Sequence, residues 1–259
     1  MHKVKITSLK TWTENLISFK INRPDDYNFI AGQFSRLGLL KQQNQDYQED
    51  NIIWRPYSIV SPEYAEELEY YSIVIPDGEF TQTLINMAVG QEILLDDKSY
   101  GLLTTDKLSG GKDLWLIATG TGLAPFISIL YNLEIWEQYQ NIILVHSAKF
   151  TDELNYQNTI NDFYSDPHYQ DLVKDKLKYI KIVTREKSGA DLYGRIPHLI
   201  SNGFLETFAQ VKFTPLDSRV MICGNPNMVK EVRSLLIKQK QFTVSSKNSL
   251  GNIVTENGY

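Results

Sequence analysis

Short β-type segments separated by turn residues make up roughly the first hundred residues. Hydrophobic and polar positions alternate in several of them, as in a strand with one buried face. We expect six strands, at residues 4–8, 16–21, 33–40, 52–60, 69–75 and 92–95. One helical pattern, at 81–88, lies between Asp77-Gly78 and the turn Val89-Gly90. The pattern predicts a closed antiparallel β-barrel with one helix.

After Ser109-Gly110-Gly111, apolar strands alternate with amphipathic helices. We expect strands at 113–118, 141–146, 178–183 and 220–223, and helices at 125–139, 152–164, 195–201 and 225–240. This alternation predicts a Rossmann-like parallel sheet with helices on both faces and ligands at the carboxyl ends of its strands. We therefore expect two domains, a β-barrel over 1–105 and an α/β domain over 106–259. The polar segment 41–51 is expected to be a solvated excursion without an assigned function.

Composition narrows the class of protein further. At 259 residues and 42% hydrophobic, the chain can bury two cores of ordinary size. It has no apolar run of membrane-spanning length and no apolar N-terminal stretch of a signal peptide, so we expect a soluble, cytoplasmic protein without a membrane partner. A single cysteine, Cys223, excludes an internal disulfide and a Cys-ligated iron–sulfur cluster. Any electron centre must then be an organic cofactor.

Charge is unevenly distributed along the chain. Residues 1–105 carry nine Lys/Arg against fifteen Asp/Glu, whereas residues 106–259 carry seventeen against sixteen. This excludes a uniformly basic surface for nucleic acid, while a local basic patch for an acidic partner stays possible. The four histidines form no ligand spacing, so no metal site is predicted.

The first motif with candidate chemistry is Arg55-Pro56-Tyr57-Ser58, at the end of an apolar segment. The Arg55 guanidinium can bind a phosphate, the Tyr57 ring can lie on a flavin, and the Ser58 hydroxyl can reach the flavin edge. Pro56 suits an extended backbone but removes one amide donor. One flavin mononucleotide moiety could use this whole set, so the motif indicates a flavin site.

The second motif is Gly120-Thr121-Gly122-Leu123-Ala124-Pro125, after the expected strand at 113–118. Glycine lets the backbone approach a pyrophosphate closely, and the helix that begins there directs amides and positive partial charge at the anion. This motif indicates a nicotinamide-nucleotide site. The order of the two motifs supports both interpretations more than either motif does alone.

These motifs, with the turn Gly78-Glu79-Phe80-Thr81 and the later Cys223-Gly224-Asn225-Pro226, give the chain a family resemblance. It resembles the ferredoxin–NADP reductase family, and most closely the bacterial ferredoxin/flavodoxin reductase branch. The resemblance covers essentially the whole chain. It implies an FAD-binding barrel domain followed by an NADP-binding α/β domain.

The resemblance implies specific FAD contacts. Arg55 looks like the phosphate ligand, Tyr57 like the ring stacked on the isoalloxazine, and Ser58 like the hydroxyl near flavin N5. The turn before the helix resembles the pyrophosphate turn, in which Thr81 and nearby amides meet the anion while the Glu79 side chain points to water. The other expected flavin contacts are Pro56, Tyr71, Ser72, Ile73 and Phe80.

It also implies the nucleotide contacts. The pyrophosphate loop would use Thr119, Gly120, Thr121 and Gly122, and Thr121 would also touch the flavin. Cys223 would lie beside the nicotinamide C4, with Gly224 and Asn225, and would position the ring rather than act as a thiolate. Arg185 and Arg195 match the pair that grips the adenosine 2′-phosphate, which predicts NADPH over NADH. Lys149 stands where related sequences often have Arg, so discrimination should be weaker.

The C-terminal tail ends on an aromatic residue, Tyr259. By the resemblance, such a residue covers the flavin or its adenine and controls nicotinamide access. Glu256 is a candidate proton-relay carboxylate near N5. It stands three residues before the end, however, whereas plant-type relatives place theirs two before, which puts its role in doubt.

The predicted activity is that of an FAD-dependent ferredoxin/flavodoxin–NADP+ reductase. It would exchange hydride between NADP(H) and FAD, and single electrons with ferredoxin or flavodoxin, with Ser58, Cys223, Glu256 and Tyr259 as the catalytic set. We expect a monomer, although the sequence does not identify the oligomeric state. Two alternatives stay open: an NADH-dependent flavin reductase of an oxygenase system, and a non-catalytic flavin- or nucleotide-binding regulatory module.

Overall fold

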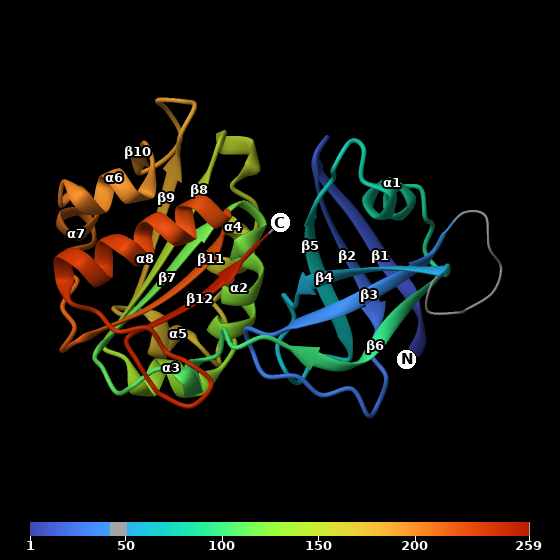
Figure 1. The fold of residues 1–259 in the computed structure, drawn as a ribbon, viewed down its shortest axis with the longest axis horizontal. Helices are drawn as coiled ribbons and strands as arrows, with labels where there is room; N and C mark the ends of the chain where they lie inside the picture. The colour runs from blue at the N-terminus through green and yellow to red at the C-terminus, as the bar shows by residue number, and fades with distance from the viewer. Residues whose placement is uncertain (42–50, 259) are drawn as a thin grey trace.

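The computed structural model describes residues 1–41 and 51–258. Figure 1 shows two lobes, the N-terminal one built of strands and the C-terminal one of a sheet between helices. The expected excursion at 41–51 lies almost entirely outside the described residues, as does Tyr259.

The N-terminal lobe is an antiparallel sheet of six strands in the order β4-β3-β6-β1-β2-β5. The strands are β1 (His2–Thr13), β2 (Leu16–Asn22), β3 (Phe34–Leu40), β4 (Ile52–Ser58), β5 (Glu67–Ile73) and β6 (Glu92–Tyr100). An antiparallel bridge between Ile59 and Tyr70 links the chain after β4 to β5, so the two edges of the sheet meet. This confirms the expected barrel.

Helix α1 (Glu79–Ile85) lies at one end of the barrel and buries Phe80 and Leu84 in its core. It begins two residues earlier and ends three residues earlier than the predicted 81–88. The predicted range included residues of the following turn, where Gly90 has a φ of +93°. The N-terminus of α1 lies in the barrel half of the chain, as the sequence indicated.

The C-terminal lobe is a parallel sheet in the order β10-β9-β8-β7-β11-β12. The strands are β7 (Asp113–Thr119), β8 (Asn141–Ala148), β9 (Leu177–Val183), β10 (Leu192–Tyr193), β11 (Ser218–Gly224) and β12 (Ile253–Asn257). The chain runs outward from β7 to β10 and then returns to the other side of β7. The strand order therefore reverses between β7 and β11, which is where open α/β sheets bind ligands.

Helices cover both faces of this sheet (Figure 1). They are α2 (Ala124–Leu130), α3 (Leu133–Gln138), α4 (Gln157–Asp162), α5 (Gln170–Val173), α6 (Ile196–Ser201), α7 (Phe204–Ala209) and α8 (Pro226–Lys240). Successive residues of β7 point to opposite faces: Leu116 packs with α2 to α5, and Ile117 packs with α6 to α8. Among the described residues, no helix is both long and apolar enough to cross a bilayer.

Two predicted helices are interrupted. The helix expected at 125–139 divides into α2 and α3 because Asn132 starts a new helix, its side chain accepting the Glu134 N–H at 2.9 Å. The helix expected at 152–164 divides into a 3₁₀ turn, η4 (Thr151–Glu153), and α4. Tyr156 between them has a left-handed φ of +63°, which a continuous helix does not allow.

The two lobes contact each other through buried polar groups as well as apolar ones. The Ser128 hydroxyl on α2 donates to the Ser61 carbonyl at 2.7 Å, and Asn155 Nδ2 donates to the Tyr71 hydroxyl at 2.9 Å. One hydrophobic cluster includes Val60 and Tyr71 of the barrel with Phe126 of α2. These contacts fix β5 against the α/β lobe. We propose the domain boundary at residues 105–106, in the connection between β6 and β7.

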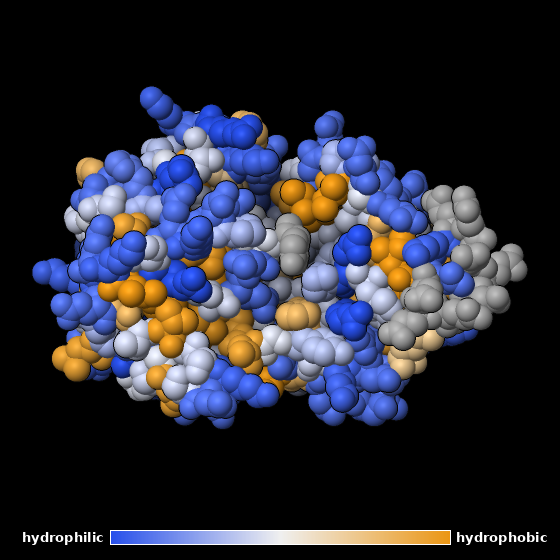
Figure 2. All heavy atoms as spheres, in the orientation of Figure 1, coloured by the Kyte–Doolittle hydropathy of each residue, from blue (hydrophilic) through white to orange (hydrophobic). Residues whose placement is uncertain are grey.

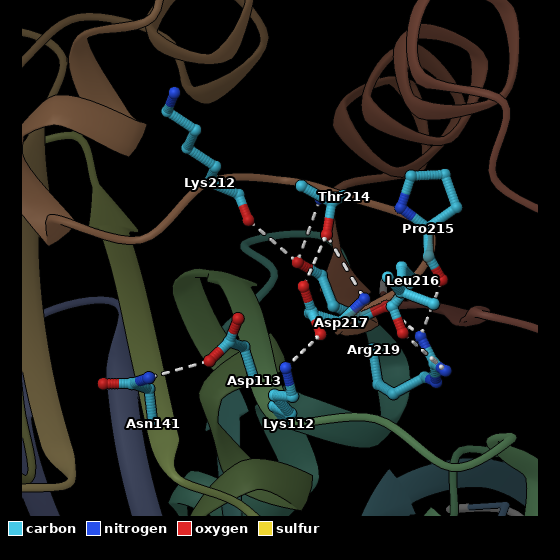
Figure 3. A network of polar contacts seen from close by, with 10 residues as sticks. Lys112, Asp113, Asn141, Lys212, Thr214, Pro215, Leu216, Asp217 and Arg219 are labelled. Atoms are coloured by element: carbon cyan, nitrogen blue, oxygen red, sulfur yellow. Dashed lines mark hydrogen bonds and ion pairs between the residues drawn. The ribbon is translucent and has the colours of Figure 1, made fainter.

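A buried arginine, Arg219, fastens that connection to the α/β lobe, and Figure 3 shows its side chain beside Pro215 and Leu216. Arg219 on β11 is 4% exposed and donates to the carbonyls of Ser109, Pro215, Leu216 and Ser218, at 2.8, 3.0, 3.3 and 2.7 Å. Beside it, Lys112 pairs with Asp217 at 3.0 Å. The residues before β7 are thus held by the segment before β11.

Replacing Arg219 with methionine should destabilise the α/β lobe by about 2–3 kcal/mol, because four backbone carbonyls lose a charged donor that is itself buried. Thermal unfolding of the full chain measures the change. The matched control is Arg233→Met, since Arg233 is exposed on α8 and should change stability by less than about 0.5 kcal/mol. Equal melting temperatures for the two variants would contradict the structural role of Arg219.

Candidate functional site

A cleft of about 660 Å³ lies where the barrel meets the carboxyl ends of β7, β11 and β12. Figure 2 shows the surface hollowed between the two lobes. Its size is typical of a pocket for a cofactor-sized ligand. Of the predicted site residues, it is lined by Arg55, Pro56, Tyr57, Ser58, Tyr71, Ser72, Ile73, Phe80, Thr81, Thr121, Gly122, Cys223 and Glu256. Residues predicted from motifs far apart in the chain therefore share one cavity.

Six further lining residues were not among the predicted ligands: Phe34, Trp54, Ile75, Gly78, Asn257 and Gly258. Trp54 and Gly78 adjoin predicted motifs and could have been found by extending them. Asn257 and Gly258 belong to β12 and its end, a strand that the sequence pattern did not predict. Phe34 reaches the cleft because β3 pairs with β4, placing it opposite Ser58.

Tyr57 is held by a cluster of aromatic rings. Its ring centroid lies 5.5 Å from that of Phe80, 5.7 Å from that of Phe19 and 6.2 Å from that of Tyr70. Burial raises the pKa of Tyr57 to about 12, so the phenol stays neutral. These contacts fix a ring that faces the cleft and can stack on a planar ligand.

Arg55 is the cation at the barrel side of the cleft. It is exposed, and its Nη1 donates to the Trp54 carbonyl at 2.8 Å. It makes no ion pair with any residue that the structure describes. Its remaining donors are available for an anionic group.

The turn before α1 is closed by the Thr81 hydroxyl. This hydroxyl accepts the Ile75 N–H at 3.1 Å and lies 3.2 Å from the carbonyls of Ile75 and Gly78. Thr81 therefore shapes the turn with its side chain, which leaves backbone amides as the donors to an anion. The Glu79 side chain is exposed, as expected.

The glycines of the second motif allow two different close approaches. Gly120 has a φ of +54°, and a side chain there would meet no atom within 4 Å, so the space above it is open to a ligand. At Gly122, a Cβ would lie 2.5 Å from the Cys223 carbonyl oxygen. Gly122 is therefore needed to bring the β7 loop against the end of β11.

The ends of β7 and β11 are also joined by hydrogen bonding. The Asn225 N–H donates to the Thr119 hydroxyl at 2.8 Å, and the Asn225 side chain caps α8 by accepting the amides of Asn227 and Met228. Gly224, with a φ of +129°, leaves room for Thr119, whose hydroxyl would lie 2.2 Å from an added Cβ. Thr119, Gly224 and Asn225 thus shape the loop beside the cleft without lining it.

Ser58, Cys223 and Glu256 all line the cleft, and Glu256 is joined to each of the other two. Cys223 on β11 is paired in register with Glu256 on β12. The Ser58 hydroxyl donates to Glu256 Oε1 at 3.3 Å. Burial raises the pKa of Glu256 to about 7 and holds that of Cys223 well above 9, so Glu256 can exchange a proton near neutral pH while Cys223 stays a thiol.

Three predicted cations lie away from the cleft, where β8, β9 and β10 end. The Arg185 N–H donates to the Lys149 carbonyl at 2.9 Å, and the Gly194 N–H donates to the Val183 carbonyl at 3.0 Å, so the segments carrying Lys149, Arg185 and Arg195 adjoin. All three are exposed. Figure 2 shows a mostly hydrophilic surface over this region of the α/β lobe. The group can bind an anion.

Comparison with known proteins gives concordant matches. A family model described as an oxidoreductase NAD-binding domain matches residues 116–234. The chain is 35% identical to a flavodoxin/ferredoxin–NADP reductase of Buchnera aphidicola subsp. Baizongia pistaciae, over 98% of this chain and 96% of that protein. It is 37% identical to a ferredoxin–NADP reductase of Pseudomonas aeruginosa, over 91% and 89% of the two chains.

A solved structure is similar across the whole chain. The ferredoxin NADP+ reductase from Neisseria gonorrhoeae, determined with bound FAD and NADP, is 37% identical to this chain and superposes with a TM-score of 0.89. The match covers all of this chain and 98% of that one.

Proposed function

Because this chain belongs to the bacterial ferredoxin(flavodoxin)–NADP reductase family, we propose that the cleft between its lobes holds FAD and that NADP(H) binds across the carboxyl end of the parallel sheet. The chain is an FAD-dependent oxidoreductase that exchanges hydride between NADP(H) and FAD and single electrons with ferredoxin or flavodoxin. The flavin supplies the conversion between two-electron and one-electron chemistry when it is bound, and the protein supplies positioning and electrostatics.

The observation that carries the proposal is the convergence of the two motifs on one cleft. The barrel contributes the Tyr57 ring, held by neighbouring aromatic rings, and the Arg55 guanidinium, which forms no ion pair with a described residue. The α/β lobe contributes Thr121 and Gly122 of the second motif and the ends of β11 and β12. A planar ring system with a phosphate chain needs both kinds of surface, so these residues fit FAD.

The barrel residues that line the cleft would bind different parts of FAD. Tyr57 would stack on the flavin ring, while Tyr71, Ser72 and Ile73 on β5 would line its side. Arg55 and the amides of the turn before α1 would bind the phosphates, with Pro56 and Phe80 completing the wall. Because Asn155 bonds to the Tyr71 hydroxyl, the α/β lobe helps to hold this strand in place.

The strand ends of the α/β lobe would position the nicotinamide. Cys223 is 1% exposed and neutral, so its role is to shape the surface beside the ring rather than to act as a nucleophile. Thr121 and Gly122 line the same cleft, and the Thr119–Asn225 bond keeps the loop after β7 against the end of β11. This arrangement favours close contact between the nicotinamide and the flavin, which hydride transfer between them requires.

Ser58 and Glu256 form a path for a proton. The Ser58 hydroxyl faces the cleft and donates to Glu256 Oε1 at 3.3 Å, so it can pass a proton from the cleft to that carboxylate. A pKa of about 7 suits Glu256 to both accepting and returning the proton. We propose that this pair moves the proton that accompanies electron transfer.

Lys149, Arg185 and Arg195 would bind the adenosine 2′-phosphate of NADP(H). A dianionic phosphate is bound most strongly by guanidinium donors, and Lys149 adds a point charge. Tyr259 remains a proposed ring over the flavin or its adenine. We also propose that the protein functions as a monomer.

Arg36 is one candidate residue for a local basic surface that would dock ferredoxin or flavodoxin. Its Nη1 is paired with Asp96 at 3.2 Å, and its guanidinium lies 5.2 Å from the Trp54 ring centroid. Because Asp96 offsets its charge, Arg36 attracts an acidic carrier less strongly than an arginine without an ion pair would. We propose that the carrier approaches the open side of the cleft, where the distance for electron transfer to the flavin would be shortest.

The visible spectrum of the purified protein tests the proposal. Without oxygen, a flavin spectrum that NADPH bleaches quickly and NADH slowly is the expected result. Faster bleaching by NADH would keep the flavin site and favour the NADH-dependent alternative. Bleaching by neither nucleotide would favour the regulatory module, and a colourless protein that cannot be reconstituted with FAD would reject the flavin site itself.

A further inference from the structure

Arg195 is already engaged by a carboxylate. Its Nη2 donates to Glu231 Oε1 at 2.9 Å and to Oε2 at 3.1 Å. Arg195 immediately precedes α6, and Glu231 lies in the second turn of α8, which packs beside α6. The two side chains are 63% and 44% exposed, so a ligand can reach the pair from solvent.

The other two cations of the proposed phosphate site differ from Arg195. Within residues 1–41 and 51–258, neither Lys149 nor Arg185 forms an ion pair. The nearby carboxylates of Glu153 and Glu186 are hydrogen-bonded to other groups. Glu153 accepts hydrogen bonds from the amides of Lys149 and Phe150. Glu186 accepts them from the amide and the hydroxyl of Thr151. Glu231 is therefore the carboxylate that is bonded to a cation of this site.

A phosphate at Arg195 would compete with this carboxylate. Both are oxyanions that seek the same guanidinium donors, and a dianion beside an ionised Glu231 is also repelled by it. The pair engages only one nitrogen of the guanidinium and is exposed, so it is weak enough for a phosphate to displace. A nucleotide that has only a 2′-hydroxyl presents no anion at this position.

We propose that Glu231 sets the affinity and specificity of the nucleotide site by competing with the 2′-phosphate for Arg195. This inference rests on the proposed function, in which Arg195 binds that phosphate. Glu231 weakens NADP(H) binding and speeds its release, whereas NAD(H) binding does not depend on Glu231. The carboxylate acts on specificity through an opposing interaction rather than through a contact with the correct ligand.

The test is the binding of NADP+, 2′-AMP and NAD+ to the FAD-loaded protein, measured by titration calorimetry at fixed ionic strength. Glu231→Gln should lower the Kd of NADP+ and of 2′-AMP by about twofold to fivefold, which is the range that an exposed ion pair contributes. The Kd of NAD+ should stay unchanged. In an Arg195→Ala background, adding Glu231→Gln should have little further effect.

Glu137→Gln is the matched control. It removes the same charge from an exposed position on α3, at the opposite end of the sheet, and should leave all three Kd values unchanged. If Glu231→Gln lowers the Kd of NAD+ by the same factor as the Kd of NADP+, the effect is one of general charge, and the inference is overturned.

The remaining outcomes separate this inference from the proposed function. If Arg195→Ala weakens NADP+ binding but Glu231→Gln leaves it unchanged or weakens it, then Glu231 does not compete and merely holds the guanidinium in place. If Arg195→Ala itself leaves NADP+ binding unchanged, the proposed 2′-phosphate role of Arg195 fails, and this inference fails with it.

Discussion

The double variant Arg185→Ala with Arg195→Ala should raise the KM for NADPH about 100-fold or more, with little change in the KM for NADH. Both side chains are exposed at the ends of the outer strands of the sheet, away from the cleft that would hold the flavin. A hydrogen bond to a charged group contributes about 1.5–3 kcal/mol, so losing two guanidinium contacts costs at least about 3 kcal/mol. That cost corresponds to about a hundredfold in affinity.

Steady-state kinetics with each nucleotide measures this effect. Since the arginines bind a part of NADPH that does not react, kcat should change less than KM. Lys149→Ala should have a smaller effect than either arginine variant, because an ammonium binds phosphate only as a point charge. Equal increases in KM for NADPH and NADH would contradict the 2′-phosphate role and would favour the NADH-dependent alternative.

Much of the site could be predicted because its motifs are local. Arg55, Pro56, Tyr57 and Ser58 occupy four consecutive positions of a strand, and Gly120 to Gly122 form one turn after a buried strand. Their side-chain types and backbone requirements can be recognised without knowing what lies opposite. The closed barrel and the parallel sheet could be predicted for the same reason, since the two halves of the chain have different hydrophobic periods.

The features that could not be predicted depend on distant pairing or on single backbone conformations. Strand β12 has five residues and pairs in parallel with β11, and its local pattern did not distinguish it from a tail. The break before α4 depends on the left-handed Tyr156. An aromatic residue carries no signal for that conformation.

Glu256 shows the same limit at the centre of the site. Counting from the C-terminus placed it one residue away from the expected position, which put its role in doubt. The register of β12 instead pairs it with Cys223, and Ser58 bonds to it from the barrel. Gly101 permits this approach, because a Cβ there would lie 2.9 Å from Glu256 Oε2. The position is set by three separate segments, none of which could be aligned from the sequence.

The stability of the protein should report the buried carboxylate independently of activity. Burial raises the folded-state pKa of Glu256 from 4.5 to about 7, so the folded protein binds its proton more tightly than the unfolded chain. Stability from this group is fully present below pH 4.5 and is lost as pH rises to about 7. Glu256→Gln lacks this loss. Between pH 5 and pH 8, the free energy of unfolding of Glu256→Gln should therefore rise by about 2 kcal/mol relative to that of the wild type.

Glu256→Gln should also lower kcat about 100-fold at pH 8 when NADPH is oxidised by ferricyanide, which takes single electrons and no proton. That reaction releases a proton from the cleft, and Glu256 must be ionised to accept it through Ser58. Wild-type kcat should therefore rise with pH through about 7 and then level off, whereas the variant should show no inflection there.

Bleaching of the flavin by NADPH, measured by stopped flow, is the control. In Glu256→Gln its rate should change less than about threefold, because no proton leaves in that half-reaction. Glu256→Asp should retain a pH inflection at a reduced rate. A variant that keeps both the wild-type rate and the inflection would show that the proton leaves by another path, and a bleaching rate that falls as far as kcat would mean that Glu256 positions the nucleotide instead.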